Sequence, residues 1–138
     1  MMAMPQRPTT GPHASTKRVL IVDDNPGLLT LISTYVAMLG CQVSQAGNGH
    51  EAFELFCRDP YDLVITDLQM PVMDGYDLLM QIKGISDRTP ILVTTGNTDL
   101  PGDKADCLSG ALDIFVKPFE LKEMGAVIQD VLGNGSPA

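Results

Sequence analysis

No apolar stretch of this 138-residue sequence is long enough to span a lipid bilayer, although 44% of the residues are hydrophobic. A membrane-spanning helix needs about 20 consecutive, mostly apolar residues. The first 17 residues, MMAMPQRPTTGPHASTK, also contain no continuous apolar core. They therefore do not resemble a secretory signal peptide, and we expect no insertion into a membrane.

Basic residues and cysteines are scarce. Nine Lys and Arg residues stand against seventeen Asp and Glu residues, which gives a net charge of −8. This charge repels phosphate backbones at long range, so we expect no direct nucleic-acid binding by this chain. The cysteines Cys41, Cys57 and Cys107 form no CxxC pair, and their odd number does not indicate a disulfide framework. This pattern favours a reducing, cytoplasmic location.

The chain length suits one domain with its own hydrophobic core. Residues 1–16 and 133–138 are rich in small, polar and helix-breaking residues, and they carry too little apolar surface to repay ordering. We therefore expect a flexible N-terminal tail over 1–16, a domain over 17–132, and a C-terminal tail or linker stub over 133–138.

Short apolar runs alternate five times with amphipathic segments inside this domain. The runs predict strands over 18–22, 42–46, 62–66, 91–95 and 113–116. The second run alternates with polar residues as an edge strand does, whereas the other four are continuously apolar, as expected of central strands covered on both faces. Repeated βα units favour a parallel sheet with helices on both sides.

Helix boundaries are readable in several of the amphipathic segments. Gly40 stands where the first helix is expected to end, and Asn48 with Glu51 three residues later forms a capping-box-like start for the second. The segment TDLPGDKADCLSG contains Pro101 and two glycines, so we expect only a short helix near 101–109.

Polar side chains lie at the carboxyl ends of four of the predicted strands, and these ends meet at one edge of a parallel sheet. Three carboxylates placed together repel one another unless cations are present. Oxygen ligands without nearby His or Cys suit Mg²⁺, and a carboxylate can attack a phosphoryl group while a metal and a lysine neutralise its charge. The polar side chains expected at this edge of the sheet are Asp23, Asp24, Asp67, Thr94, Thr95 and Lys117.

Four segments, VLIVDDNP, DLVITDLQMPVMDG, PILVTTG and GALDIFVKPF, occur in this order across residues 17–132. Together they resemble the receiver domains of two-component response regulators. The resemblance implies a flavodoxin-like, doubly wound α/β fold with a five-stranded parallel sheet of order 2-1-3-4-5 and five helices. It also implies an aspartate that accepts a phosphoryl group from a sensor histidine kinase or a histidine phosphotransfer protein.

The resemblance assigns roles to individual residues. Asp67 would be the phosphoacceptor, and Lys117 would pair first with Asp67 and then with its phosphoryl group. Asp24, Asp67 and the backbone carbonyl of Gln69 would bind Mg²⁺, with Asp23 assisting directly or through water. The Lys117–Pro118 peptide would be cis.

The switch residues follow from the same motifs. Thr95 lies five residues after Pro90 and would supply the switch hydroxyl, with Gly96 leaving the phosphoryl group accessible. Gln69 and Asn97 would tune the hydrolysis of that group by positioning or excluding water.

Output would use the face formed by the fourth helix, fifth strand and fifth helix, toward an unknown output domain or target. This face is compatible with a homodimer. At one position of the face the family usually has Tyr or Phe, but this sequence has Ile114, and we expect its neighbour Phe115 to point to the opposite face. Either Ile114 repacks during switching, or the signal travels through the helix near 101–109.

Several alternatives are compatible with parts of this pattern. Asp23 and Asp24 could cap the first helix, because acidic residues favour helix N-termini. The domain could be an interaction module that works without phosphorylation, and Ile114 is the argument for that function. An aspartyl-phosphate phosphohydrolase usually carries a second acid two residues after the nucleophile, where this chain has Gln69. We therefore expect self-catalysed phosphotransfer and autodephosphorylation rather than turnover of a separate substrate.

Overall fold

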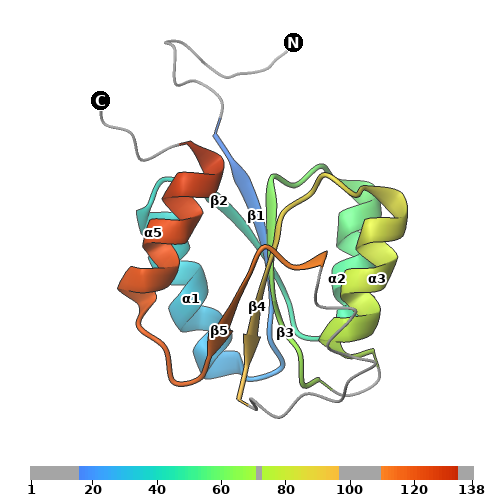
Figure 1. Ribbon diagram of the computed structural model, residues 1–138, viewed down its shortest axis with the longest axis horizontal. Coiled ribbons are helices and arrows are strands. Elements are labelled where there is room, and N and C mark those ends of the chain that lie inside the picture. Colours follow the sequence, from blue (N-terminus) through green and yellow to red (C-terminus); the bar gives the residue numbers. More distant parts are fainter. Residues whose placement is uncertain (1–15, 71–72, 97–109, 134–138) are drawn as a thin grey trace.

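The computed structural model describes residues 16–70, 73–96 and 110–133. Its centre is one parallel five-stranded sheet with the order β2-β1-β3-β4-β5 (Figure 1). This order confirms the prediction. The strands are β1 (Arg18–Val22), β2 (Gln42–Ala46), β3 (Leu63–Asp67), β4 (Ile91–Thr95) and β5 (Asp113–Val116).

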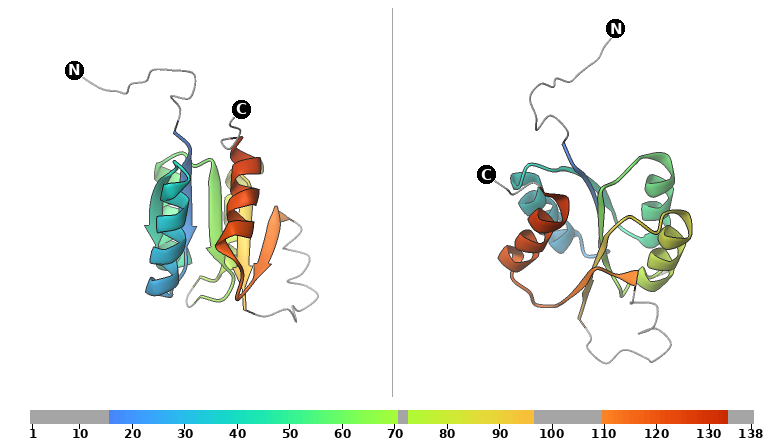
Figure 2. Two further views of the ribbon diagram at one scale, coloured as in Figure 1. Left: turned by 90° about the vertical axis from the view of Figure 1, so that its left-hand side faces the viewer. Right: turned by 45° about the horizontal axis from the view of Figure 1, so that its top comes forward.

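Helices cover both faces of the sheet (Figures 1 and 2). On one face α1 (Pro26–Met38) and α5 (Leu121–Leu132) enclose a core cluster, and on the other face α2 (Gly49–Arg58) and α3 (Gly75–Ile85) enclose a second one. The short helix expected near 101–109, residues 134–138 of the C-terminal tail expected over 133–138, and most of the N-terminal tail lie outside the described residues. No helix within the described ranges is long and apolar enough to cross a membrane.

Side-chain caps fix where three of these helices begin. Asn25 accepts a hydrogen bond from the backbone N–H of Leu28 at 3.1 Å and is the N-cap of α1. Asn48 and Asp74 cap α2 and α3 in the same way. Because Asn25 is the cap, the alternative that Asp23 and Asp24 cap this helix is wrong, and both acids are available for another role.

The two edge strands differ from each other. β2 has the mixed exposure that its alternating sequence predicts. The apolar run of β5 was expected to be covered on both faces, and this expectation is wrong: β5 pairs with β4 at the sheet edge, and within it Phe115 alone is buried. Ile114 is 38% exposed, whereas Phe115 packs into the cluster beneath α1 and α5. An apolar run shows that a strand is present but does not show how many of its faces are covered.

Candidate functional site

The predicted side chains converge at the carboxyl edge of the sheet. Asp67 is the last residue of β3, and Asp23 and Asp24 directly follow β1. Carboxylate oxygens of the three residues lie within 4.8 Å of one another. Asp23 and Asp67 are buried, at 2% and 4% exposure, whereas Asp24 is exposed. The cluster therefore has a buried side and a side that is open to solvent.

Lys117 brings a positive charge to this cluster from the end of β5. Its Nζ lies 3.2 Å from Asp67 Oδ2 and 3.4 Å from Asp23 Oδ2. Its backbone N–H donates to the carbonyl oxygen of Thr95 at 2.7 Å, which continues the pairing of β5 with β4. The Lys117–Pro118 peptide is cis, as expected. One ammonium thus contacts both buried carboxylates.

The surroundings of Asp67 raise the pKa of its carboxyl above the ordinary value. Burial raises the pKa of the Asp67 carboxyl, and the negative charge of Asp23 raises this pKa further. The Lys117 ammonium and the backbone N–H of Gln69, which donates to Asp67 Oδ1 at 3.3 Å, lower the pKa but do not fully compensate. An additional cation beside Asp67 would therefore be stabilised.

The donor set fits a hard divalent cation. Mg²⁺ is bound through one or two carboxylates and keeps several of its waters. The cluster offers carboxylate oxygens at suitable separations, and exposed Asp24 leaves room for water. The hydrogen bond from Gln69 N–H also places the backbone of Gln69 next to Asp67. Coordination by the Gln69 carbonyl stays a prediction.

The Thr95 hydroxyl lies at the end of β4, against the side chain of Gln69. Gln69 Nε2 donates to Thr95 Oγ1 at 3.0 Å, and Thr95 Oγ1 lies 3.2 Å from Gln69 Oε1, to which it can donate. The backbone N–H of Gly96 donates to the same Oε1 at 3.2 Å. A Cβ at Gly96 would have no heavy atom of the described residues within 4 Å, so this side of the described site is open. Asn97 lies outside the described residues.

In the segment MDG, Asp74 caps the start of α3. The structure adds a contact that sequence reasoning missed. A Cβ at Gly75 would overlap the backbone carbonyl oxygen of Asp67, and Gly75 N–H donates to the Leu68 carbonyl at 3.1 Å. The absence of a side chain at Gly75 thus allows α3 to start directly against Asp67. The sequence signal that could have indicated this contact is the glycine, Gly75, directly after the cap residue Asp74.

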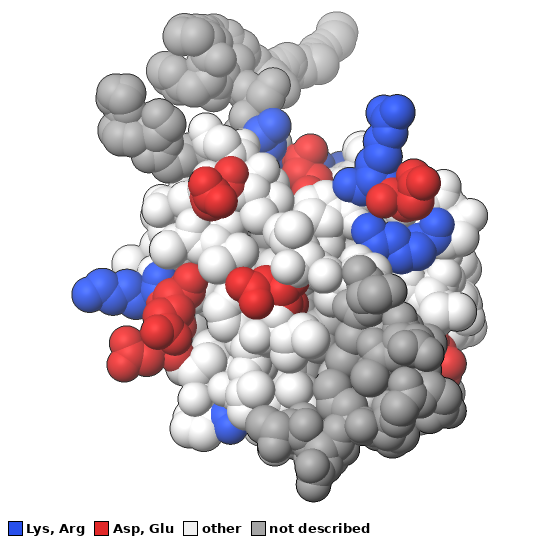
Figure 3. Space-filling view, in the orientation of Figure 1, with Lys and Arg blue, Asp and Glu red and all other residues white. Residues whose placement is uncertain are grey.

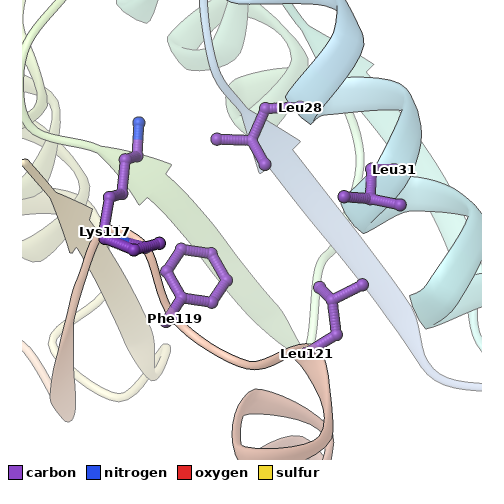
Figure 4. Close-up of a pocket in the computed structure, with 6 residues that line it drawn as sticks. Leu28, Leu31, Lys117, Phe119 and Leu121 are labelled. Atoms are coloured by element: carbon purple, nitrogen blue, oxygen red, sulfur yellow. The ribbon is translucent and has the colours of Figure 1, made fainter.

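An apolar groove adjoins the acidic cluster on the face of α1 and α5 (Figure 4). Its volume is about 440 Å³. Leu31 of α1 is 52% exposed beside this groove, and Lys117 extends its nitrogen away from Phe119 and Leu121 (Figure 4). Lys117 therefore connects the groove with the acidic cluster. The groove is lined by Leu28, Leu31, Lys117, Pro118, Phe119 and Leu121.

Charged side chains on the face drawn in Figure 3 form small groups of both signs, separated by uncharged surface. The acidic cluster differs from these surface groups in two ways: two of its carboxylates are buried, and both contact the same lysine, Lys117.

Comparisons with known proteins agree with this geometry. Residues 19–129 match the family model of the response regulator receiver domain. The chain is 39% identical, over 122 residues, to the probable transcriptional regulator ycf27 of Guillardia theta, covering 88% of this chain and 48% of that protein. It spans about half or less of the length of the curated relatives that it matches.

Two solved structures are similar over their whole length. One is the receiver domain of sensor histidine kinase PA1611 from Pseudomonas aeruginosa with magnesium in its active-site cleft, at 32% identity, a TM-score of 0.76, and coverage of 86% of this chain and 99% of that one. The other is response regulator TrrA from Thermotoga maritima in complex with Mg²⁺ and BeF, at 28% identity, a TM-score of 0.76, and coverage of 84% and 99%.

Proposed function

Because the chain belongs to the response regulator receiver domain family, we propose that Asp67 accepts a phosphoryl group from a phosphohistidine on a partner protein. The observation that carries this proposal is the position of Asp67, which is buried, lies within 4.8 Å of two other carboxylates and contacts Lys117 at 3.2 Å. The partner is a sensor histidine kinase or a histidine phosphotransfer protein.

In the transfer, an Asp67 carboxylate oxygen attacks phosphorus, an O–P bond forms, and the N–P bond to the partner's imidazole breaks. Lys117 is close enough to keep one contact with Asp23 while it turns from the carboxylate to the transferred oxygens. Mg²⁺, when bound, would neutralise charge on these oxygens, and Asp23, Asp24, Asp67 and the Gln69 carbonyl would hold it. The domain thus supplies the groups for its own phosphorylation.

Thr95 is proposed to donate its hydroxyl to the transferred group, and Gly96 leaves space for it. Gln69 and Asn97 tune the later attack of water. Ile114 lies on the same side of the sheet as Thr95, since β4 and β5 pair Val93 with Ile114 and Thr95 with Val116. Ile114 is therefore proposed to respond to movement of Thr95 on the output side of β5.

The groove beside Lys117 is the proposed contact for an apolar helix of the phosphodonor. An occupant of this groove would lie beside the groups that receive the phosphoryl group, because Lys117 lines the groove and also contacts Asp67. Helix α1 presents no charged side chain along its 13 residues, which suits an apolar partner.

Intact-mass measurement after incubation with Mg²⁺ and acetyl phosphate tests the role of Asp67. Wild type should gain one phosphoryl group and Asp67→Asn none. Equal gain in the variant, or none in wild type, would exclude the proposal.

Leu31→Ala tests the docking surface separately. A fully buried Leu contributes about 1.5–3 kcal/mol, so burial of its exposed half accounts for roughly 1 kcal/mol, or about fivefold in affinity. Transfer from a phosphohistidine protein should weaken by this factor, whereas labelling by acetyl phosphate should stay unchanged. Met38→Ala, at the far end of α1 and also exposed, is the matched control.

A further inference from the structure

The side chain of Gln69 joins the loop after β3 to the end of β4. Its amide makes contacts with the Thr95 hydroxyl at 3.0 and 3.2 Å and accepts the Gly96 N–H at 3.2 Å. Its backbone N–H donates to Asp67 Oδ1 at 3.3 Å. One residue therefore contacts the candidate phosphoacceptor through its backbone and the candidate switch residue through its side chain.

The chemistry of these contacts fixes the orientation of the amide. A backbone N–H can only donate, so the group that faces Gly96 must be Oε1 rather than Nε2. A carbonyl oxygen has two lone pairs, and here one takes the Gly96 N–H and the other the Thr95 hydroxyl. The Thr95 hydroxyl has a single proton and cannot donate it to Gln69 and to a phosphoryl oxygen at the same time.

We propose that Gln69 is a positioning residue that holds the Thr95 hydroxyl and the Gly96 N–H in the unphosphorylated arrangement. This inference rests on the proposed function of Asp67 and Thr95, and it goes beyond control of water. Before Thr95 can donate to a phosphoryl group, its hydroxyl must stop donating to Gln69 Oε1, although it can still accept from Gln69 Nε2. Gln69 thereby opposes the phosphorylated state and lowers the affinity of the site for a phosphoryl group.

Solvent limits how strongly Gln69 can disfavour the phosphorylated state. Gln69 is exposed, so water can replace part of what its amide loses. Each hydrogen bond contributes about 0.5–1.5 kcal/mol net, so two of them in the lower part of this range, about 1–2 kcal/mol together, would change an equilibrium by roughly 5- to 30-fold.

The test uses two variants that remove the contact in different ways. Gln69→Leu keeps the approximate size of the side chain without its amide, and Gln69→Asn keeps an amide that is one methylene too short. Gln81→Leu, at an exposed position of α3, is the matched control for the loss of an amide. The measured quantities are the affinity for beryllofluoride in excess Mg²⁺ and the hydrogen exchange of the Gly96 amide without beryllofluoride, both by NMR.

Both Gln69 variants should bind beryllofluoride about 5- to 30-fold more tightly than wild type and exchange the Gly96 amide faster, and Gln81→Leu should match wild type. Unchanged or weaker beryllofluoride binding in either Gln69 variant overturns the proposal, because it shows that the amide is neutral or assists the phosphoryl group. No beryllofluoride binding by wild type overturns the proposed function itself, and the exchange of the Gly96 amide still decides whether Gln69 holds it.

Discussion

Replacement of the phosphoacceptor candidate by its neutral isostere should stabilise the metal-free protein. Asp67→Asn removes a carboxylate charge from a site where 4% of the residue is exposed. At an effective dielectric constant of about 20, the attraction between Asp67 and Lys117 at 3.2 Å amounts to roughly 5 kcal/mol. At 4.8 Å, the upper bound of these separations, the repulsion from the buried Asp23 carboxylate amounts to roughly 3.5 kcal/mol, whereas solvent screens the repulsion from exposed Asp24.

These opposing interactions largely cancel, so burial of the charge decides the sign. The raised pKa of Asp67 has burial as its largest cause, which agrees with this balance. We expect Asp67→Asn to increase the free energy of unfolding by about 1–2 kcal/mol at neutral pH without divalent metal.

The gain should depend on pH in a defined direction. The ordinary pKa of the Asp67 carboxyl is 3.8 and describes the unfolded chain, whereas the folded pKa is raised. Between the two values the folded state binds more protons, so wild-type stability falls as the pH rises through this interval. The advantage of Asp67→Asn is therefore complete above the folded pKa and disappears below pH 3.8.

Urea denaturation in a chelating buffer across this pH range measures the effect. Asp130→Asn, at an exposed position of α5, controls for the loss of one negative charge elsewhere. A less stable Asp67→Asn variant, or an advantage that grows as the pH falls, would refute the electrostatic argument.

Three further predictions concern neighbouring residues. Lys117→Met leaves two buried carboxylates without their ammonium, so without metal at neutral pH it should lower the free energy of unfolding by about 2–4 kcal/mol, and less at acidic pH, as measured by urea denaturation. Asp24→Asn should weaken Mg²⁺ binding about tenfold or more in calorimetric titration, yet change the free energy of unfolding by less than about 0.5 kcal/mol, because Asp24 is exposed. Gly75→Ala should destabilise by about 2–3 kcal/mol in the same denaturation assay, because its Cβ would overlap the Asp67 carbonyl oxygen. Its control is Gly84→Ala in the same helix, where no heavy atom of the described residues lies within 4 Å of the added Cβ, and this control should instead stabilise by about 0.5–1 kcal/mol.

The sequence predicted the sheet and the edge where polar residues gather, because both depend on local patterns. Apolar runs locate the five strands to within one residue, although Asp67 proved to be part of β3 rather than the residue after it. Once the strands are parallel, their carboxyl ends must meet, so Asp23, Asp67 and Lys117 could be brought together without coordinates.

Contacts that depend on side-chain reach were beyond the sequence. Gln69 and Thr95 are 26 residues apart, and their hydrogen bonds depend on the path of the loop after β3. The groove between α1 and the segment before α5 depends likewise on how two helices pack. The exposure of Ile114 could not be read from an apolar run that suits either an edge or a central strand.

The sheet itself separates the proposed input from the proposed output. Asp67 pairs with Thr94 and Thr94 with Phe115, so these three side chains belong to the face covered by α1 and α5. Lys117 lines the groove on that face. By the same alternation, Thr95 shares the opposite face with Ile114.

A phosphoryl group on Asp67 would therefore be delivered from one face, while its effect on Ile114 must cross to the other. The Thr95 hydroxyl lies at the end of β4, where the path from one face of the sheet to the other is short. Gln69 forms hydrogen bonds with that hydroxyl. The strength of the hydrogen bonds between Gln69 and Thr95 should therefore control how strongly phosphorylation of Asp67 changes the conformation of Ile114 on the opposite face. A variant that weakens this contact should shift the resonances of β5 toward their beryllofluoride-bound positions before any phosphoryl group is added, and Ile114 is the residue where that shift should be read.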